Sequence, residues 1–230
     1  MNKEEIGAEI KRLSKDQPWN HQFYLPYGLK TRDIDIDSPG YNINKWPRLS
    51  PIFEKLLGEN CKSVLDVGCS DGYYSIQIAR ENPKTSVLGI DLDNIRIERS
   101  NFIKRLAEVE NCHFDTLDLY DLITKKTKYD IVMGLGLLHR VPDLDKCIDD
   151  LCTLSRHYVV FEFKTYKTEE SSYIDRSGKT KSNTLNGLYK IPSISYVEER
   201  LQKNGFKMHT LLEDDSSLNY PRTILVGKNE

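Results

Sequence analysis

The sequence predicts a doubly wound α/β fold built on a mostly parallel sheet of seven strands. Between residues 62 and 163, five short runs rich in β-branched and apolar residues alternate with longer segments of helical spacing, which is typical of parallel strands joined by crossover helices. Two more apolar runs beyond residue 205 add two strands. A glycine-bearing turn directly follows the first run, as expected where the first strand of such a sheet passes into its helix.

The expected elements follow one another in a regular order. Core strands are expected at residues 63–67, 86–90, 112–116, 129–133 and 158–163. Helices are expected between them at 73–81, 95–109, 119–124 and 144–154. A helix at 193–204, with Ser193 as its N-cap and Gly205 as its left-handed stop, then precedes strands at 206–212 and 222–226.

Two long segments interrupt this alternation and define the expected domain organisation. Residues 1–60 are expected to form an N-terminal helical and aromatic cap segment, and residues 61–230 the α/β domain with a lid insertion at 164–190. The stretch 16–45 is too aromatic for disorder, so it is expected to pack over the sheet edge. Its aromatic residues and histidine are Trp19, His21, Phe23, Tyr24, Tyr27 and Tyr41.

Composition and charge exclude several classes of protein. The 33 Lys and Arg against 35 Asp and Glu give a net charge of −2, so no broad positive field draws the chain onto nucleic acid or anionic lipid. The apolar runs are far shorter than a membrane span, and the acidic first residues do not resemble a signal peptide, so a cytoplasmic protein is expected. Five cysteines without metal-ligand or paired spacing predict buried, reduced thiols and no metal site.

Residues 64–73 carry the strongest functional signal, because there an apolar strand runs into a glycine-bearing turn that opens a helix. Gly68 and Gly72 would let a ligand approach the backbone closely, although two glycines alone could form a plain tight turn. Asp91 ends the next strand, where a carboxylate can take the ribose hydroxyls of a nucleoside. The G-x-G-x-x-G spacing of a dinucleotide-binding dehydrogenase is absent.

The pattern Asp-x-Gly-x-Ser-x-Gly beginning at Asp66 resembles motif I of class I S-adenosylmethionine-dependent methyltransferases, whose Rossmann-like fold and cofactor are therefore implied. The resemblance places Asp66 near the methionine amino group and Asp91 at the ribose. Ser70 stands where the family has a glycine, and it is expected to be tolerated with a negative φ. The implied cofactor-binding residues are Asp66, Gly68, Ser70, Gly72, Asp91, Leu92, Asp118, Leu119, Gly134 and Lys45.

A narrower resemblance points to the family of tRNA wobble-uridine carboxymethyltransferases. It covers most of the chain and rests on residues 19–48, 66–69, 134–140, 188–193 and 220–222. That family uses carboxy-S-adenosylmethionine and holds the extra carboxylate with basic and hydroxyl side chains. Lys45 and Arg222 match, but His21 replaces a lysine and Leu138 a tyrosine. Losing a charged hydrogen bond costs about 1.5–3 kcal/mol, so unmodified S-adenosylmethionine is the expected cofactor.

The candidate catalytic residues each have a structural alternative. His139 follows the fourth strand and is the first candidate base because a free histidine titrates near neutrality; the alternative is a capping or packing histidine. Glu162, a charge within an apolar strand, would accept a proton or bind the acceptor, or else form a salt bridge with Lys164 or Arg222. His21 is the third candidate.

The predicted function is methyl transfer to a small polar acceptor, such as a hydroxyl of a sugar or a sugar-linked metabolite. His21 and Tyr24 are expected to close over the methyl group, and Tyr24, Tyr189 and Arg222 to line the acceptor site. One alternative keeps tRNA wobble uridine as the acceptor, which the pI of about 6.2 does not favour. Another is a non-catalytic partner subunit that binds S-adenosylmethionine.

Overall fold

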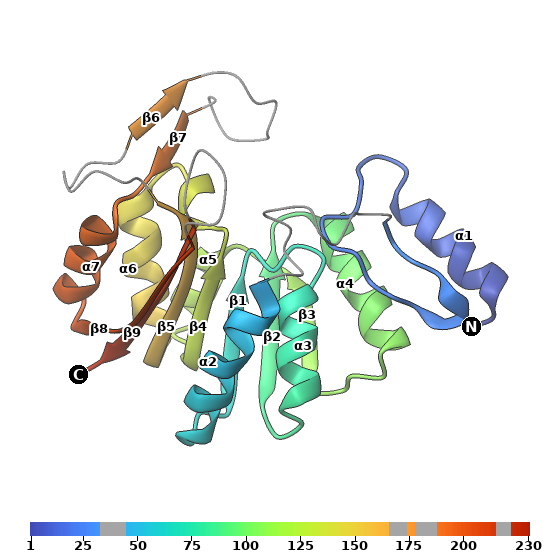
Figure 1. The fold of residues 1–230 in the computed structure, drawn as a ribbon, viewed down its shortest axis with the longest axis horizontal. Coiled ribbons are helices and arrows are strands. Elements are labelled where there is room, and N and C mark those ends of the chain that lie inside the picture. The colour runs from blue at the N-terminus through green and yellow to red at the C-terminus, as the bar shows by residue number, and fades with distance from the viewer. Residues whose placement is uncertain (33–44, 166–173, 178–187, 215–221) are drawn as a thin grey trace. The chain divides into compact units, whose positions relative to one another are not determined.

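The computed structural model describes residues 1–32, 45–165, 174–177, 188–214 and 222–230 (Figure 1). Its larger sheet has seven strands in the order β3-β2-β1-β4-β5-β9-β8, which confirms the predicted fold class. These strands are β1 Ser63–Val67, β2 Ser86–Asp91, β3 Cys112–Thr116, β4 Tyr129–Leu135, β5 Ser155–Lys164, β8 Phe206–Asp214 and β9 Arg222–Asn229. In the ranges just given, no helix combines the length and apolar character needed to cross a bilayer.

The helices between the core strands follow the alternation that the apolar spacing predicts, and two further helices precede the first strand. They are α1 Lys3–Leu13, α2 Trp46–Gly58, α3 Tyr73–Glu81, α4 Asn94–Leu106, α5 Leu119–Thr124, α6 Leu144–Leu154 and α7 Ile194–Lys203, with short 3-10 turns η1 Pro26–Gly28 and η3 Leu138–Arg140. Ser193 caps α7, and Gly205 follows it at φ +80°, both as predicted. The helix expected at 95–109 instead ends at Leu106, because Glu108 turns the backbone to φ +53°.

The chain divides into two compact units. The first contains Met1–Lys62 and Cys69–Asp118, and the second contains Ser63–Gly68 and Leu119–Glu230. In the second unit, β1 pairs with β4 and β4 with β5 in parallel, whereas β9 pairs antiparallel with both β5 and β8. The centre of this unit is apolar, since the side chains of β4 and β5 at Ile131, Val132 and Val160 are fully buried.

In the first unit, β2 and β3 pair in parallel and α3 and α4 carry the N-terminal aromatic segment. Trp19 packs against Phe102 of α4, and His21 stacks on Tyr73 of α3. The described part of the segment packs on these two helices, and its expected position over the sheet edge stays a prediction. Tyr41 lies outside the described residues.

The expected lid insertion at 164–190 falls only partly within the described residues. Two short strands from this stretch, β6 Ile174–Ser177 and β7 Leu188–Ile191, pair antiparallel to form a second, two-stranded sheet. Residues 166–173 and 178–187 lie outside the described part of the chain. The described part of the insertion therefore contains an ordered strand pair.

Candidate functional site

The backbone conformation and the close packing of the glycine-bearing turn require a glycine at position 72. Its φ is +75°, and a Cβ atom placed there would lie 2.8 Å from the Cβ of Ser100 and 2.7 Å from Cζ of Phe114. The backbone N–H of Cys69 donates to the carbonyl of Ile90, 3.0 Å away, so the turn is tied to the end of β2. The turn therefore combines a left-handed backbone with close packing on α4 and β3.

Replacing Gly72 by alanine is expected to lower the free energy of unfolding by about 2 kcal/mol, because the new methyl group overpacks and the left-handed backbone disfavours a side chain. Denaturant unfolding monitored by circular dichroism measures this loss. Gly28→Ala is the matched control, since Gly28 has φ +70° but nothing lies within 4 Å of its Cβ position. Equal losses in the two variants would contradict a packing role for Gly72.

Ser70 adopts φ +55°, so the expected negative φ is wrong. Two hydrogen bonds hold this conformation: the Ser70 N–H donates to Oδ2 of Asp91 at 2.9 Å, and its Oγ accepts from Nδ2 of Asn20 at 2.6 Å. These contacts offset the roughly 1–2 kcal/mol that a left-handed L-residue costs. A serine therefore replaces the family's glycine here because its side chain has a partner.

Asp91 lies at the end of β2 with both carboxylate oxygens engaged by backbone donors. Oδ2 accepts from Ser70 and Oδ1 accepts from the N–H of Asp93 at 3.0 Å. Since each carboxylate oxygen has two lone pairs, hydroxyl donors can still bind. The next side chain, Leu92, is 72% exposed. A half-buried carboxylate beside an exposed apolar side chain suits the ribose and base of a nucleoside.

Asp71, which the sequence reasoning did not single out, is fully buried beside Ser70. Its Oδ2 accepts the backbone N–H groups of Asn20, at 2.5 Å, and His21, at 3.2 Å, and its Oδ1 lies 3.3 Å from Nη1 of Arg99. Burial raises the pKa of Asp71, and the Arg99 guanidinium opposes that rise. A carboxylate between a turn glycine and the buried strand before it was the signal that could have identified it.

His21 is a buried, neutral histidine. Its ring stacks on Tyr73 with centroids 5.2 Å apart, and among the described residues neither ring nitrogen has a hydrogen-bond partner. Burial, together with the positive charges of Lys45, Arg96 and Arg32, lowers its pKa to about 3. Tyr24, its predicted companion, is 57% exposed.

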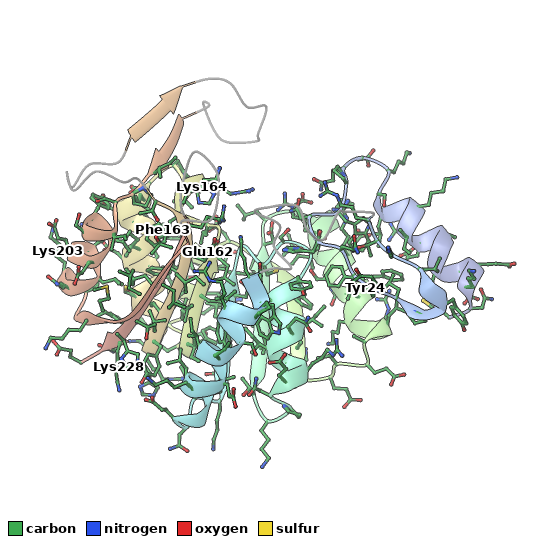
Figure 2. The ribbon with its side chains drawn as sticks, in the orientation of Figure 1. Tyr24, Glu162, Phe163, Lys164, Lys203 and Lys228 are labelled. Carbon is green, nitrogen blue, oxygen red and sulfur yellow. The ribbon has the colours of Figure 1, made fainter. Side chains whose placement is uncertain are left out.

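In the second unit, Glu162 and Arg222 form an ion pair. The Arg222 guanidinium binds both carboxylate oxygens of Glu162, with Nη2 2.8 Å from Oε2. Glu162 is 2% exposed on β5, so the salt-bridge alternative is the arrangement found, with Arg222 as partner. The N–H of Gly136 donates to the Glu162 carbonyl at 2.6 Å. Figure 2 shows Glu162 and Lys164 toward one end of β5, and Lys228 of β9 toward the other.

His139 lies in η3 and is 4% exposed. Burial and the charges of Arg222 and Arg140 lower its pKa to about 3, well below that of the free histidine from which the candidate base was inferred. A base whose conjugate acid is this strong accepts protons weakly at neutral pH. The catalytic role of His139 stays a prediction.

The remaining predicted residues are placed as follows. Gly68 and Gly134 both pack on Leu137, which would lie 3.2 Å from a Cβ at either position. Asp66 is buried on β1. Asp118 is exposed, Leu119 begins α5, and Lys45 directly precedes α2. Tyr189 lies on β7, and its side chain is outside the described part of the structure.

The five cysteines are free and buried, as predicted. Burial raises the pKa values of Cys147 and Cys152 to about 12, so these two thiols are protonated at neutral pH. Protonated thiols are poor nucleophiles and poor metal ligands. Among the residues that the structure describes, no group of three histidine, cysteine or acidic side chains could hold a metal ion.

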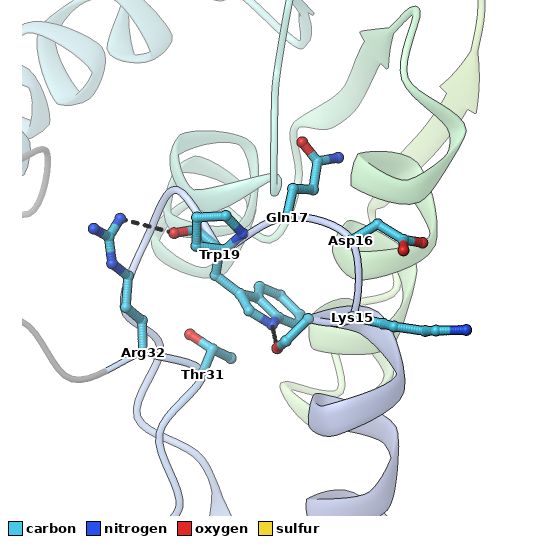
Figure 3. Close-up of a pocket in the computed structure, with 8 residues that line it drawn as sticks. Lys15, Asp16, Gln17, Trp19, Thr31 and Arg32 are labelled. Carbon is cyan, nitrogen blue, oxygen red and sulfur yellow. Dashed lines mark hydrogen bonds between the residues drawn. The ribbon is translucent and has the colours of Figure 1, made fainter. Parts of the chain in front are cut away.

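An open pocket of about 400 Å³ lies in the first unit, next to the Gln17 and Pro18 carbonyls that Arg99 binds. Figure 3 shows Arg32 bound to the carbonyl of Trp19, and the Trp19 indole bound to Ser14. The pocket is lined by residues 14–19, Thr31 and Arg32. None of the predicted site residues lines it.

The strand order and the glycine-bearing turn after β1 define the class I methyltransferase fold. The family model described as "Methyltransferase domain" matches residues 59–216, and the chain belongs to this family. The enzyme class is therefore the predicted one, an S-adenosylmethionine-dependent methyltransferase.

Among curated proteins, the tRNA U34 carboxymethyltransferase of Campylobacter jejuni subsp. jejuni strain 81-176 is 29% identical over 211 residues, covering 91% of this chain and 68% of the relative. Among solved structures, the N-terminal domain of EvdMO1, crystallised in the presence of S-adenosylhomocysteine and D-fucose, has a TM-score of 0.81 at 18% identity, covering 100% of this chain and 98% of that one. Magnesium protoporphyrin IX methyltransferase from Synechocystis PCC 6803, with bound S-adenosylmethionine, has a TM-score of 0.66 at 18% identity, covering 97% and 91%.

Proposed function

We propose that the protein transfers the methyl group of S-adenosylmethionine to a small polar acceptor, with a hydroxyl of a sugar or sugar-linked metabolite as the first candidate. The observation that carries the proposal is the neutral His21. It occupies the position where the resembling carboxymethyltransferases have a lysine, and its pKa of about 3 leaves it uncharged at neutral pH. A neutral imidazole offers no positive charge to an extra carboxylate on the cofactor.

The end of β2 suits the nucleoside part of the cofactor. The Asp91 carboxylate is fixed by the N–H groups of Ser70 and Asp93, and it retains lone pairs for two ribose hydroxyls. The exposed Leu92 offers an apolar surface for the adenine. The other residues of the implied cofactor set, among them Asp66, Gly68 and Gly134, stay predictions.

Bound S-adenosylmethionine supplies an electrophilic methyl group on a sulfonium. The protein contributes alignment of the acceptor with that group and exclusion of water. A hydroxyl acceptor also has to release a proton, and His139, neutral down to a pH of about 3, would orient the hydroxyl as a hydrogen-bond acceptor rather than act as a strong base. Arg222, fixed by Glu162, would bind a negative group on the acceptor.

A second candidate is carboxymethyl transfer to tRNA. Two observations favour it: the curated relative from Campylobacter jejuni is named tRNA U34 carboxymethyltransferase, and the positive charges of Lys45, Arg96 and Arg32 act on the surroundings of His21. These cations would attract the carboxylate of carboxy-S-adenosylmethionine even though His21 is neutral. The two candidates therefore differ in the cofactor that should bind more tightly.

Calorimetric titration with S-adenosylmethionine and with its carboxylated form tests the proposal. The unmodified cofactor is expected to bind about 10–100-fold more tightly, the equivalent of one missing charged hydrogen bond. Asp91→Ala is the control for the nucleoside site and should weaken both cofactors by a similar factor. A matched substitution outside the candidate groups, Asp150→Asn on α6, should change neither affinity.

The alternative results point to different functions. Tighter binding of the carboxylated cofactor would overturn the proposal and make tRNA the first acceptor to test, by a salt-dependent gel shift. Absence of binding to either cofactor would overturn both candidates, whereas binding of the cofactor without turnover of any acceptor would favour the non-catalytic partner subunit. Preference for the unmodified cofactor would be followed by assays with sugars, since EvdMO1 was crystallised in the presence of D-fucose.

A further inference from the structure

A buried polar connection in the first unit joins the N-terminal segment to the glycine-bearing turn. We call residues 17–21 the anchor segment. Asp71 of the turn is 0% exposed and Arg99 of α4 is 1% exposed. Both carboxylate oxygens of Asp71 are used, one by the backbone of the anchor segment at Asn20 and His21, the other by Arg99.

The other N–H groups of Arg99 donate hydrogen bonds to backbone carbonyls in and next to the anchor segment. Arg99 binds the carbonyl of Leu13 through two nitrogens, at 2.7 and 3.1 Å, that of Gln17 at 2.5 Å and that of Pro18 at 3.1 Å. Its guanidinium also lies 5.0 Å from the ring centroid of Trp19. Since buried ion pairs add little stability compared with apolar packing, the pair is better explained by the geometry that it fixes.

Asn20 connects the buried Asp71–Arg99 pair to the candidate cofactor site. Once Asp71 holds the Asn20 backbone, the Asn20 amide lies 2.6 Å from Oγ of Ser70. Ser70, held at φ +55°, then donates its N–H to Asp91. Seating of the anchor segment and orientation of the Asp91 carboxylate therefore depend on the same set of hydrogen bonds.

We propose that Asp71 and Arg99 are positioning residues, which couple the seating of residues 17–21 to nucleoside binding at Asp91 through Asn20 and Ser70. The inference rests on the proposed function, in which Asp91 takes the ribose of the cofactor. It predicts that ligand binding at Asp91 stabilises the anchor segment. It also predicts that a substitution that breaks this set of hydrogen bonds weakens ligand binding although every residue that touches the ligand keeps its identity.

The test uses S-adenosylhomocysteine as ligand and two variants. Asn20→Ala removes the amide that reaches Ser70 and keeps the buried pair, so the melting temperature without ligand should stay within about 2 °C of the wild-type value. Its dissociation constant should rise about tenfold, the effect of one hydrogen bond. Asp71→Asn keeps an oxygen that accepts the two backbone N–H groups but loses the charge that faces Arg99. Its dissociation constant for S-adenosylhomocysteine should rise at least as much as that of Asn20→Ala.

Hydrogen exchange supplies the readout that a merely structural role would not change. In the wild type, ligand should slow exchange of the Asn20 and His21 amides. In Asn20→Ala this ligand-induced protection should decrease rather than disappear, because the hydrogen bond from Gln17 to Asp93 still connects the anchor segment to Asp91. Asp149→Asn, which breaks an ion pair with Arg200 in the second unit, is the matched control and should leave affinity and protection unchanged.

Two results would overturn the inference, and they are distinguishable. If the wild type binds S-adenosylhomocysteine and both variants match its affinity and its ligand-induced protection, the coupling is absent while the proposed function stands. If the wild type does not bind the ligand, the proposed function fails, and the inference with it. Should Asp71→Asn fail to fold, Asn20→Ala alone decides between these outcomes.

Discussion

Replacement of Arg222 by methionine is expected to lower the free energy of unfolding by about 3–5 kcal/mol, because it leaves the carboxylate of Glu162 buried without its guanidinium. Glu162 is 2% exposed, and both of its oxygens bind Arg222. Methionine keeps much of the apolar volume of the arginine side chain. The decrease in the free energy of unfolding therefore comes mainly from loss of the guanidinium charge. Urea unfolding at pH 7.5 measures it.

The double variant Glu162→Leu with Arg222→Met is the control. Because it removes both charges, it should recover most of the stability lost in the single variant. A loss below about 1 kcal/mol in Arg222→Met would contradict the buried pair. If the free energy of unfolding falls as much in the double variant as in the single one, the destabilisation comes from lost packing and not from the unpaired charge.

The protein is expected to unfold at a higher pH than protonation of its carboxylates alone would cause, because two histidines are buried in neutral form. His21 and His139 have pKa values lowered from 6.5 to about 3. Between these values the unfolded chain binds more protons than the folded chain, so stability falls as the pH falls from 6.5 toward 3. Each histidine contributes about 1.4 kcal/mol per pH unit, or about 2 kcal/mol at pH 5.

Urea unfolding at several pH values between 5 and 6 measures this slope. The wild type should lose about 2.4 kcal/mol between pH 6 and pH 5, because unfolded histidines are only partly protonated at pH 6. His21→Gln or His139→Gln should each reduce the slope by about half, whatever its effect on stability at pH 7.5. His157→Gln is the matched control, since the side chain of His157 is 58% exposed. A wild-type slope below about 1.4 kcal/mol per pH unit would contradict two buried neutral histidines.

The strands and helices were predictable because their signals are local. The first strand and the helices at 73–81, 119–124 and 144–154 match the structure at both ends, since apolar runs and helical spacing are read over a few neighbouring residues. The end of α4 was missed because Glu108 adopts a left-handed conformation that its residue type does not favour.

The candidate site was less predictable because its properties depend on residues far apart in the sequence. Ser70 takes a positive φ because Asn20, fifty residues earlier, binds its hydroxyl. The low pKa values of His21 and His139 follow from burial and from cations brought near by folding. Motif spacing identified Asp91, but the buried partner of Asp71 lies on α4, where nothing in the local pattern marks Arg99 as more than a surface charge.

The position of β9 in the sheet has a consequence for synthesis on the ribosome. β9 follows β8 in the chain but pairs between β5 and β8, so β8 cannot join the sheet until β9 has been made. Until residues 222–229 emerge, β5 has an open edge, which is the kind of surface on which growing chains aggregate. The same pairing brings Arg222 to Glu162, so the edge of β5 is covered and the Glu162–Arg222 ion pair forms in one step.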